Sequence, residues 1–311
     1  MRNLPVVRRT YAYVVVGVGL LLLLLGALKI VPGLLGAGIG LALLGLLLFG
    51  LSFVPRPADT TETAPMPFHE RLVGLFFEPS RVFRSLRAHP AWLAALVVIT
   101  LLNFSYSAAF MRRLTPERVV GYQVDKLAES GWMPPEVAAQ QRAEGIAGAR
   151  DPVRVAGGAV TSFVGYFCLM AFMAGLGLLL VLLFGGRINF WQTFSALVHA
   201  ALPVTIIQQL LNLVLLYVKD PDDIHPILGQ GGLVTDNLGA LFSPGEHPIL
   251  FAAASNIGLL IFYRVWLTAT GLRHAGERVS SGTGWAVAIA FWLVGLLLSV
   301  GSSALFGNMF A

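Results

Sequence analysis

Seven stretches of mainly apolar residues, each long enough to cross a lipid bilayer, run along the chain. A transmembrane helix needs about 20 such residues in a row. The stretches cover residues 11–30, 34–54, 91–111, 157–184, 190–217, 248–270 and 283–306. All 16 acidic residues lie outside them, and only Lys29 and Arg264 among the bases lie inside, each near an end where a long side chain reaches the headgroups. The pattern predicts an all-α membrane protein with about seven transmembrane helices.

The spacing of the apolar stretches divides the chain into three parts. Residues 1–54 are predicted to form a two-span hairpin, because no small-residue cleavage site follows the first stretch and Val31-Pro32-Gly33 leads directly into the second. Residues 55–90 are predicted to form a cytoplasmic linker that ends in an amphipathic helix. Residues 91–311 are predicted to form a five-span bundle. In the second stretch, Gly36 and Gly40 have the GxxxG spacing that lets helices approach closely in lipid.

A short amphipathic segment precedes the third stretch. Arg81, Arg84 and Arg87 recur at helical spacing, while Phe83 and Leu86 lie on another face. A basic face opposite a Phe/Leu face is typical of a helix that lies in the membrane interface and faces anionic lipid. The alternative is a short solvated connector.

Residues 112–156 form a polar insert between the third and fourth stretches. Thr115-Pro116-Glu117 and Pro134-Pro135-Glu136 each have the pattern of a helix start, with proline at the first helical position. The insert is therefore predicted to be a pair of short extramembrane helices that cap one face of the bundle.

The second large loop, residues 218–247, is acidic. Asp222, Asp223 and His225 are side chains of types that bind cations, but a solvated acidic loop is the commoner structure with this composition. We therefore predict no metal site and no other cofactor.

Composition supports a membrane location and argues against nucleic acid as a partner. The chain is 56% hydrophobic and only 12% charged, so lipid is its natural solvent. A net charge of +5 without an aromatic and basic patch is too mild for nucleic-acid binding. Only three of the 21 bases are lysine, a bias typical of GC-rich bacterial genomes. The predicted location is the bacterial cytoplasmic (inner) membrane, and the predicted partner is the bilayer, including its anionic lipids.

The distribution of basic residues predicts the orientation. With a cytoplasmic N-terminus and alternating spans, residues 1–10, 55–90, 185–189 and 271–282 face the cytoplasm and hold eleven Lys and Arg residues. With Arg264 the cytoplasmic side holds twelve, while the far side holds nine with Lys29, over more loop residues. Because cytoplasmic loops carry an excess of Lys and Arg, this orientation is favoured, and it places the C-terminus outside.

The sequence contains no catalytic motif that we can find. Intramembrane proteases need two aspartates within spans, a serine paired with histidine, or H-E-x-x-H for zinc, and none of these patterns occurs. A phosphate-binding loop of the G-x-x-x-x-G-K-[ST] type is also missing. We therefore predict a protein without enzymatic activity.

Polar residues within the predicted spans are the remaining candidates for a functional site. They are His199, Gln208, Gln209 and Asn212 in the fifth stretch and Tyr166 in the fourth. One interpretation is a polar pathway between spans three, four and five, near a kink at Pro203. The alternative is ordinary hydrogen bonding between helices, worth about 0.6–2 kcal/mol per contact.

Four local sequences follow one another in a fixed order along the chain. They are Leu75-Phe76-Phe77-Glu78-Pro79-Ser80-Arg81-Val82-Phe83 with His89-Pro90-Ala91-Trp92, then Ser130-Gly131-Trp132-Met133-Pro134-Pro135-Glu136, then Phe184-Gly185-Gly186-Arg187-Ile188-Asn189-Phe190 with Ala201-Leu202-Pro203, and Trp266-Leu267 with Gly271-Leu272. This ordered set resembles the Yip family, whose eukaryotic members interact with Ypt/Rab GTPases, and the bacterial branch is more similar. The resemblance covers residues 67–307 and implies five spans with a cytoplasmic N-terminus, so residues 91–311 are expected to form a Yip-like bundle. The N-terminal hairpin lies outside it.

The resemblance implies little biochemistry. The acidic D-L-Y-G-P-type motif of the eukaryotic branch is absent, so Rab binding is not implied. We expect a scaffold, adaptor or membrane-organising protein whose partner is another membrane protein or a second copy of the chain. The alternative is a small permease or channel, with a polar path lined by spans three to five.

Overall fold

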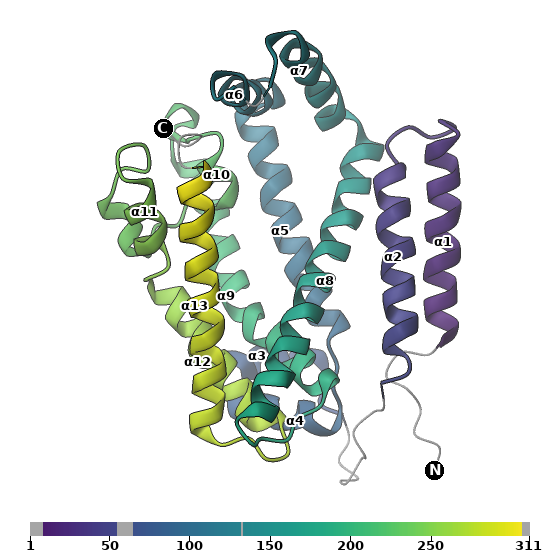
Figure 1. Ribbon diagram of the computed structural model, residues 1–311, viewed down its shortest axis with the longest axis vertical. Coiled ribbons are helices and arrows are strands. Elements are labelled where there is room, and N and C mark those ends of the chain that lie inside the picture. The colour runs from purple at the N-terminus through teal and green to yellow at the C-terminus, as the bar shows by residue number, and fades with distance from the viewer. Residues whose placement is uncertain (1–8, 55–64, 132, 307–311) are drawn as a thin grey trace. The chain divides into compact units, whose positions relative to one another are not determined.

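The computed structural model describes residues 9–54, 65–131 and 133–306, which are helical (Figure 1). Within these ranges no β-strand occurs, and strand-like pairing is limited to two isolated bridges. The helices are α1 (Arg9–Ala27), α2 (Leu35–Leu51), α3 (Phe68–Phe77), α4 (Pro79–Ala88), α5 (Leu93–Leu114), α6 (Pro116–Glu129), α7 (Pro135–Arg150), α8 (Pro152–Leu183), α9 (Phe190–Val218), α10 (Leu228–Gly231), α11 (Pro248–Ser255), α12 (Leu259–Ala275) and α13 (Ser281–Phe306), with 3₁₀ turns η1 (Pro221–Asp223) and η2 (Leu238–Leu241).

Five of the described helices are long and apolar enough to cross a membrane: α1, α5, α8, α9 and α13. Helix α2 is apolar but has only 17 residues. The all-α architecture is therefore confirmed, while five candidate spans stand against about seven predicted from the sequence.

The prediction of one continuous helix over residues 248–270 is wrong. The chain breaks between α11 and α12, and the segment before η2 pairs with the break through a bridge between Asn237 and Gly258. The carbonyl of Asn256 accepts a hydrogen bond from Trp292 Nε1 at 2.8 Å, and Asp236 Oδ2 accepts one from the backbone N–H of Leu260 at 2.8 Å. These side chains compensate the backbone groups that the break releases, which is why an apolar sequence tolerates it.

The chain packs as two units. The first contains Pro152–Pro203, Leu267–Val287 and the described residues up to Thr100. The second contains Leu101–Asp151, Val204–Trp266 and the described residues from Ala288. Helices α5, α9, α12 and α13 contribute residues to both.

In the first unit, glycines let α2 pack closely on two neighbours. Helices α1 and α2 lie side by side as a hairpin (Figure 1), and a Cβ atom on Gly19 or Gly38 would collide with the backbone of the opposite helix. On another face of α2, a Cβ on Gly40 would lie 3.7 Å from the Val164 side chain of α8. The hairpin therefore packs on α8 of the same chain, and Gly40 of the GxxxG pair lies at this contact.

The core of the first unit is aromatic and centres on the start of α9. Trp191 stacks against Trp92 with ring centroids 6.3 Å apart, and Phe194 contacts both Trp92 and Phe167. Residues 191–203 are buried without exception, so this half of α9 is enclosed on every side. The enclosed segment also carries four buried polar side chains, those of Gln192, Thr193, Ser195 and His199.

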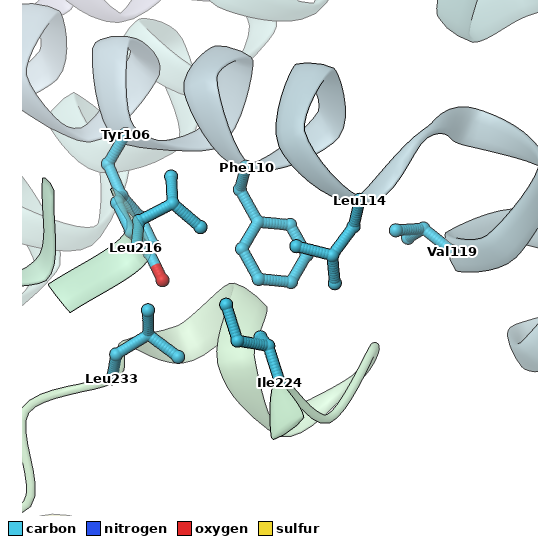
Figure 2. Close-up of a cluster of buried hydrophobic side chains, with 7 residues drawn as sticks. All are labelled: Tyr106, Phe110, Leu114, Val119, Leu216, Ile224 and Leu233. Carbon is cyan, nitrogen blue, oxygen red and sulfur yellow. The ribbon is translucent and has the colours of Figure 1, made fainter. Parts of the chain in front are cut away.

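In the second unit, a compact apolar cluster joins α5 to the loop after α9 (Figure 2). Its members are Tyr106, Phe110, Leu114, Val119, Leu216, Ile224 and Leu233. The Tyr106 hydroxyl donates to the carbonyl of Gly229, so the cluster also fixes the path of the loop. Helices α6 and α7 pack on each other within the segment for which the sequence predicts two short helices.

Candidate functional site

Helix α4 is attached to the protein by its apolar face. Val82, Phe83 and Leu86 are buried, and the Phe83 ring lies over Gly271 of α12, where a Cβ atom would lie 3.0 Å from Phe83 Cε1. The expectation that Phe83 lies at the membrane surface is therefore wrong. The missing side chain at Gly271 leaves a slot for the aromatic ring, and burying the ring within the protein satisfies the apolar face that the sequence pattern assigned to lipid.

The opposite face of α4 carries the three exposed arginines that the sequence singled out. Arg81 forms an ion pair with Glu78 at 3.3 Å. Arg87 donates from a guanidinium nitrogen to the carbonyl of Glu277 at 3.4 Å, and its own carbonyl accepts a bond from Gln192 Nε2 at 2.9 Å. The packed apolar face and the bonds of Arg87 hold helix α4 in place, so the three arginines project from one face of a fixed helix.

Arg84 and Arg87 line an open pocket of about 500 Å³. Its other walls are the turn after α8 and the loop between α12 and α13, which are joined by a backbone bridge in which Arg187 N donates to Arg278 O at 2.7 Å. Gly185 has a φ of +75° and makes the turn that brings the two loops together. The remaining lining residues are Phe184, Gly185, Gly186, Arg273, His274, Gly276, Glu277, Arg278, Val279, Ser280 and Thr283.

The exposed apolar residues next to this face belong to α3. Val73 and Phe77 are one helical turn apart and are 58% and 81% exposed. They line a second groove, of about 420 Å³, together with Arg81. The amphipathic surface predicted for α4 alone is thus divided between two helices, with apolar side chains from α3 beside arginines from α4.

The polar residues in the second half of α9 form a closed network. Gln209 Nε2 donates to Asn103 Oδ1 at 2.8 Å, and Asn212 Nδ2 donates to Gln209 Oε1 at 3.2 Å. Asn212 Oδ1 accepts the backbone N–H groups of Leu233 at 2.7 Å and Val234 at 2.9 Å. Gln209 and Asn212 therefore tie the loop after α10 to α9 and stabilise the second unit.

His199 belongs to the first unit. Its Nδ1 bonds to the carbonyl of Ser195 at 2.9 Å, so Nδ1 carries the proton and Nε2 is an acceptor. Among the described residues, the buried His199 Nε2, Ser195 Oγ and Trp191 Nε1 have no hydrogen-bond partner. Each is one helical turn from the next on α9. Of the other predicted residues, Gln208 is partly buried in the second unit and Tyr166 partly buried in α8.

The acidic loop, residues 218–247, is bonded both within itself and to helix α6. Arg118 pairs with Asp222 at 2.9 Å. His225 Nδ1 accepts the backbone N–H groups of Ile227 and Leu228 at 3.1 and 3.2 Å, and Nε2 lies 3.2 Å from the Tyr122 hydroxyl. Over the residues that the structure covers, no group of three or more His, Cys, Asp or Glu side chains is arranged to hold a metal ion.

Sequence reasoning missed the residues that face Arg84 across the pocket. Arg273 and Arg278 entered the charge distribution but were not recognised as neighbours of α4, about 190 positions earlier in the chain. The available signal was a pair of bases around Gly276, with Arg273 in the last turn of α12 and Arg278 just after the helix. Nothing in the periodicity pairs them with α4, because that pairing depends on how Phe83 packs on α12.

Taken together, the apolar helices and the all-helical fold define an integral, multi-pass membrane protein. The Yip1 domain matches residues 73–302, about three quarters of the chain, and the chain belongs to this family. The matched range contains α4, the pocket and the polar network, while α1 and α2 precede it. Comparisons with curated proteins and with solved structures found no match.

The two groups of intramembrane polar residues predict opposite mutational effects. Asn212→Leu leaves two buried backbone N–H groups without an acceptor and is expected to destabilise the protein by about 2–4 kcal/mol. His199→Leu removes an imidazole whose Nε2 has no partner, so stability is expected to be unchanged or increased. Thermal unfolding of both variants in the same detergent, followed by tryptophan fluorescence, measures the difference. Equal losses of stability in the two variants would contradict this assignment.

His225 predicts a pH dependence of stability. Burial and the nearby charge of Lys126 lower its pKa from the ordinary value of 6.5, and a protonated Nδ1 cannot accept the two backbone bonds. Because the folded-state pKa lies below the unfolded value, the stabilisation is complete above pH 6.5 and is lost as the pH falls through the folded-state value.

We expect the midpoint of thermal unfolding to fall between pH 8 and pH 5 more steeply in the wild type than in His225→Asn. The amide oxygen of that variant accepts the same N–H groups without titrating. If the unfolding midpoints of the wild type and of His225→Asn change equally with pH, His225 does not control the stability of this loop.

Proposed function

We propose that this chain is a non-enzymatic scaffold or adaptor of the bacterial branch of the Yip family. In this proposal it resides in the cytoplasmic membrane with its N-terminus inside and its C-terminus outside. Its partner is another membrane protein or a second copy of the chain, recruited at the arginine face formed by Arg81, Arg84 and Arg87.

The observation that carries this proposal is the anchoring of α4. A solvated connector would leave its side chains free, whereas Val82, Phe83 and Leu86 are buried and the end of the helix is bonded to Gln192. The three arginines are thereby presented in a preorganised row, which lowers the entropic cost of binding. Val73 and Phe77 beside them supply exposed apolar area, and apolar residues combined with arginine are typical of interaction surfaces.

The permease alternative has less support. It needs Gln209 and Asn212 to line a wet path, but their side chains bond to each other, to Asn103 and to the loop backbone. Asn212 is fully buried. We therefore do not propose transport.

The proposal predicts a specific crosslink. Replacing Phe77, which is 81% exposed, with the photoreactive analogue benzoylphenylalanine places a crosslinker beside the arginine face. Irradiation of intact membranes is expected to give one discrete adduct with a protein partner or a second copy of the chain. Adding Arg81→Glu, Arg84→Glu and Arg87→Glu is expected to reduce its yield about tenfold or more, because the charge complementarity is reversed.

The matched control reverses the same number of charges elsewhere, with Arg112→Glu, Arg142→Glu and Arg150→Glu, and is expected to keep the adduct. Size-exclusion profiles confirm that each variant is folded. An adduct that survives reversal of the arginine face, or irradiation that yields no protein adduct, would overturn the scaffold proposal.

A further inference from the structure

The pocket beside α4 gathers positive charge without compensation. Four of its lining residues are arginines, namely Arg84, Arg87, Arg273 and Arg278, and its only carboxylate belongs to Glu277. Throughout the described residues, none of these four forms an ion pair with an acidic side chain. By contrast, the arginines of α6 and α7, and Arg81 outside the pocket, each pair with a carboxylate. A pocket lined by charges of one sign raises the local concentration of counter-ions, so this one attracts anions.

The donors in the pocket suit a tetrahedral oxyanion. A guanidinium presents several N–H groups in a fixed fork that matches phosphate oxygens, and bidentate pairing with phosphate is a main use of arginine. The first turn of α13 adds to the favourable potential, because Ser280 caps that helix by accepting the N–H of Thr283 at 3.0 Å and both residues line the pocket. This 26-residue helix directs the positive end of its dipole toward the same space.

The pocket lies at the ends of two candidate membrane spans. It is lined by residues that directly follow α8, which ends at Leu183, and by residues around the start of α13 at Ser281. Both helices are candidate membrane spans, so their ends lie near the boundary between hydrocarbon and water. Phe184, at the edge of the pocket, is 52% exposed, and Leu183 beside it is 77% exposed. Apolar side chains in this position suit acyl chains below a bound headgroup.

We propose that this pocket binds the phosphate group of an anionic membrane lipid, with Arg84, Arg273 and Arg278 as its principal ligands. Phosphate chemistry is common to lipids and soluble anions, and the exposed Phe184 and Leu183 favour the lipid. The proposal deepens the proposed function by naming a ligand for the arginine face. The lipid proposal rests on the proposed function in one respect only, which is that the arginine face lies at the membrane surface.

The test uses the full chain in dodecyl maltoside and measures thermal unfolding during titration with phosphatidylglycerol or with phosphatidylcholine. A lipid that binds the folded state raises the unfolding temperature according to its concentration relative to Kd. We expect saturable stabilisation by phosphatidylglycerol, and at least about tenfold weaker stabilisation by the zwitterionic lipid. Equal effects of the two lipids would overturn the proposal.

The variant Arg84→Gln, Arg273→Gln, Arg278→Gln tests the residues. Each basic residue near an anionic surface contributes about fivefold in affinity, so the apparent Kd for phosphatidylglycerol is expected to rise about a hundredfold. The control Arg112→Gln, Arg142→Gln, Arg150→Gln removes the same charge outside the pocket and is expected to stay within about twofold of the wild type. Matching unfolding temperatures in phosphatidylcholine confirm that both variants fold. Equal losses of affinity would overturn the assignment to this pocket.

Inorganic phosphate and glycerol phosphate distinguish the two sources of the anion. Neither is expected to stabilise the protein at concentrations where phosphatidylglycerol saturates. If they match the lipid, the ligand is a soluble phosphate and the lipid proposal fails. Because these titrations contain no protein partner, their failure leaves the crosslinking result intact, and failure of the crosslink leaves lipid binding standing.

Discussion

The structure depends on one constraint, which is that hydrocarbon offers no hydrogen bonds to an exposed backbone. The long helices α8 and α9 satisfy their own peptide groups, and each departure from a helix in an apolar segment needs a side chain to compensate. Asn212 accepts two N–H groups of the loop after α10, and Asp236 accepts the N–H of Leu260 at the start of α12. The polar side chains of Gln209 and Asn212 on α9 meet this requirement, since they bond to each other, to Asn103 and to the loop backbone.

Without a hydrophobic force between helices in lipid, close packing carries much of the remaining stability. Glycine allows this close packing at two kinds of contact. In the hairpin, Gly19 and Gly38 let the backbones of α1 and α2 approach directly. At α4, Gly271 accommodates the ring of Phe83 and so fixes a surface helix against α12. The same packing that anchors α4 brings its arginines next to Arg273 and Arg278, so the charged pocket is a consequence of an apolar contact.

The sequence predicted what depends on local pattern. Hydropathy located α5, α8, α9 and α13 to within a few residues, apart from an earlier start of α8, and the helix-start pattern at Pro116 coincides with the start of α6. The sequence-based prediction failed where the local structure depends on a side chain that is distant in sequence. The break at Asn256 depends on hydrogen bonds with Trp292 and Asp236. The apolar pattern of residues 248–270 carries no sign of these bonds, so it predicts one continuous helix. The position of Phe83 was missed because an amphipathic helix has the same periodicity whether its apolar face meets lipid or protein.

The orientation we propose places α4, residues 185–189 and residues 271–282 on the cytoplasmic side of the membrane. The most direct measurement is labelling of single cysteines by a membrane-impermeant maleimide, in a Cys168→Ser background. Arg81→Cys and Arg278→Cys are predicted to be labelled in inverted vesicles and protected in intact cells, while Glu246→Cys is predicted to behave in the opposite way. Labelling of Arg81→Cys and Arg278→Cys in intact cells, or on different sides of the membrane, would contradict the account.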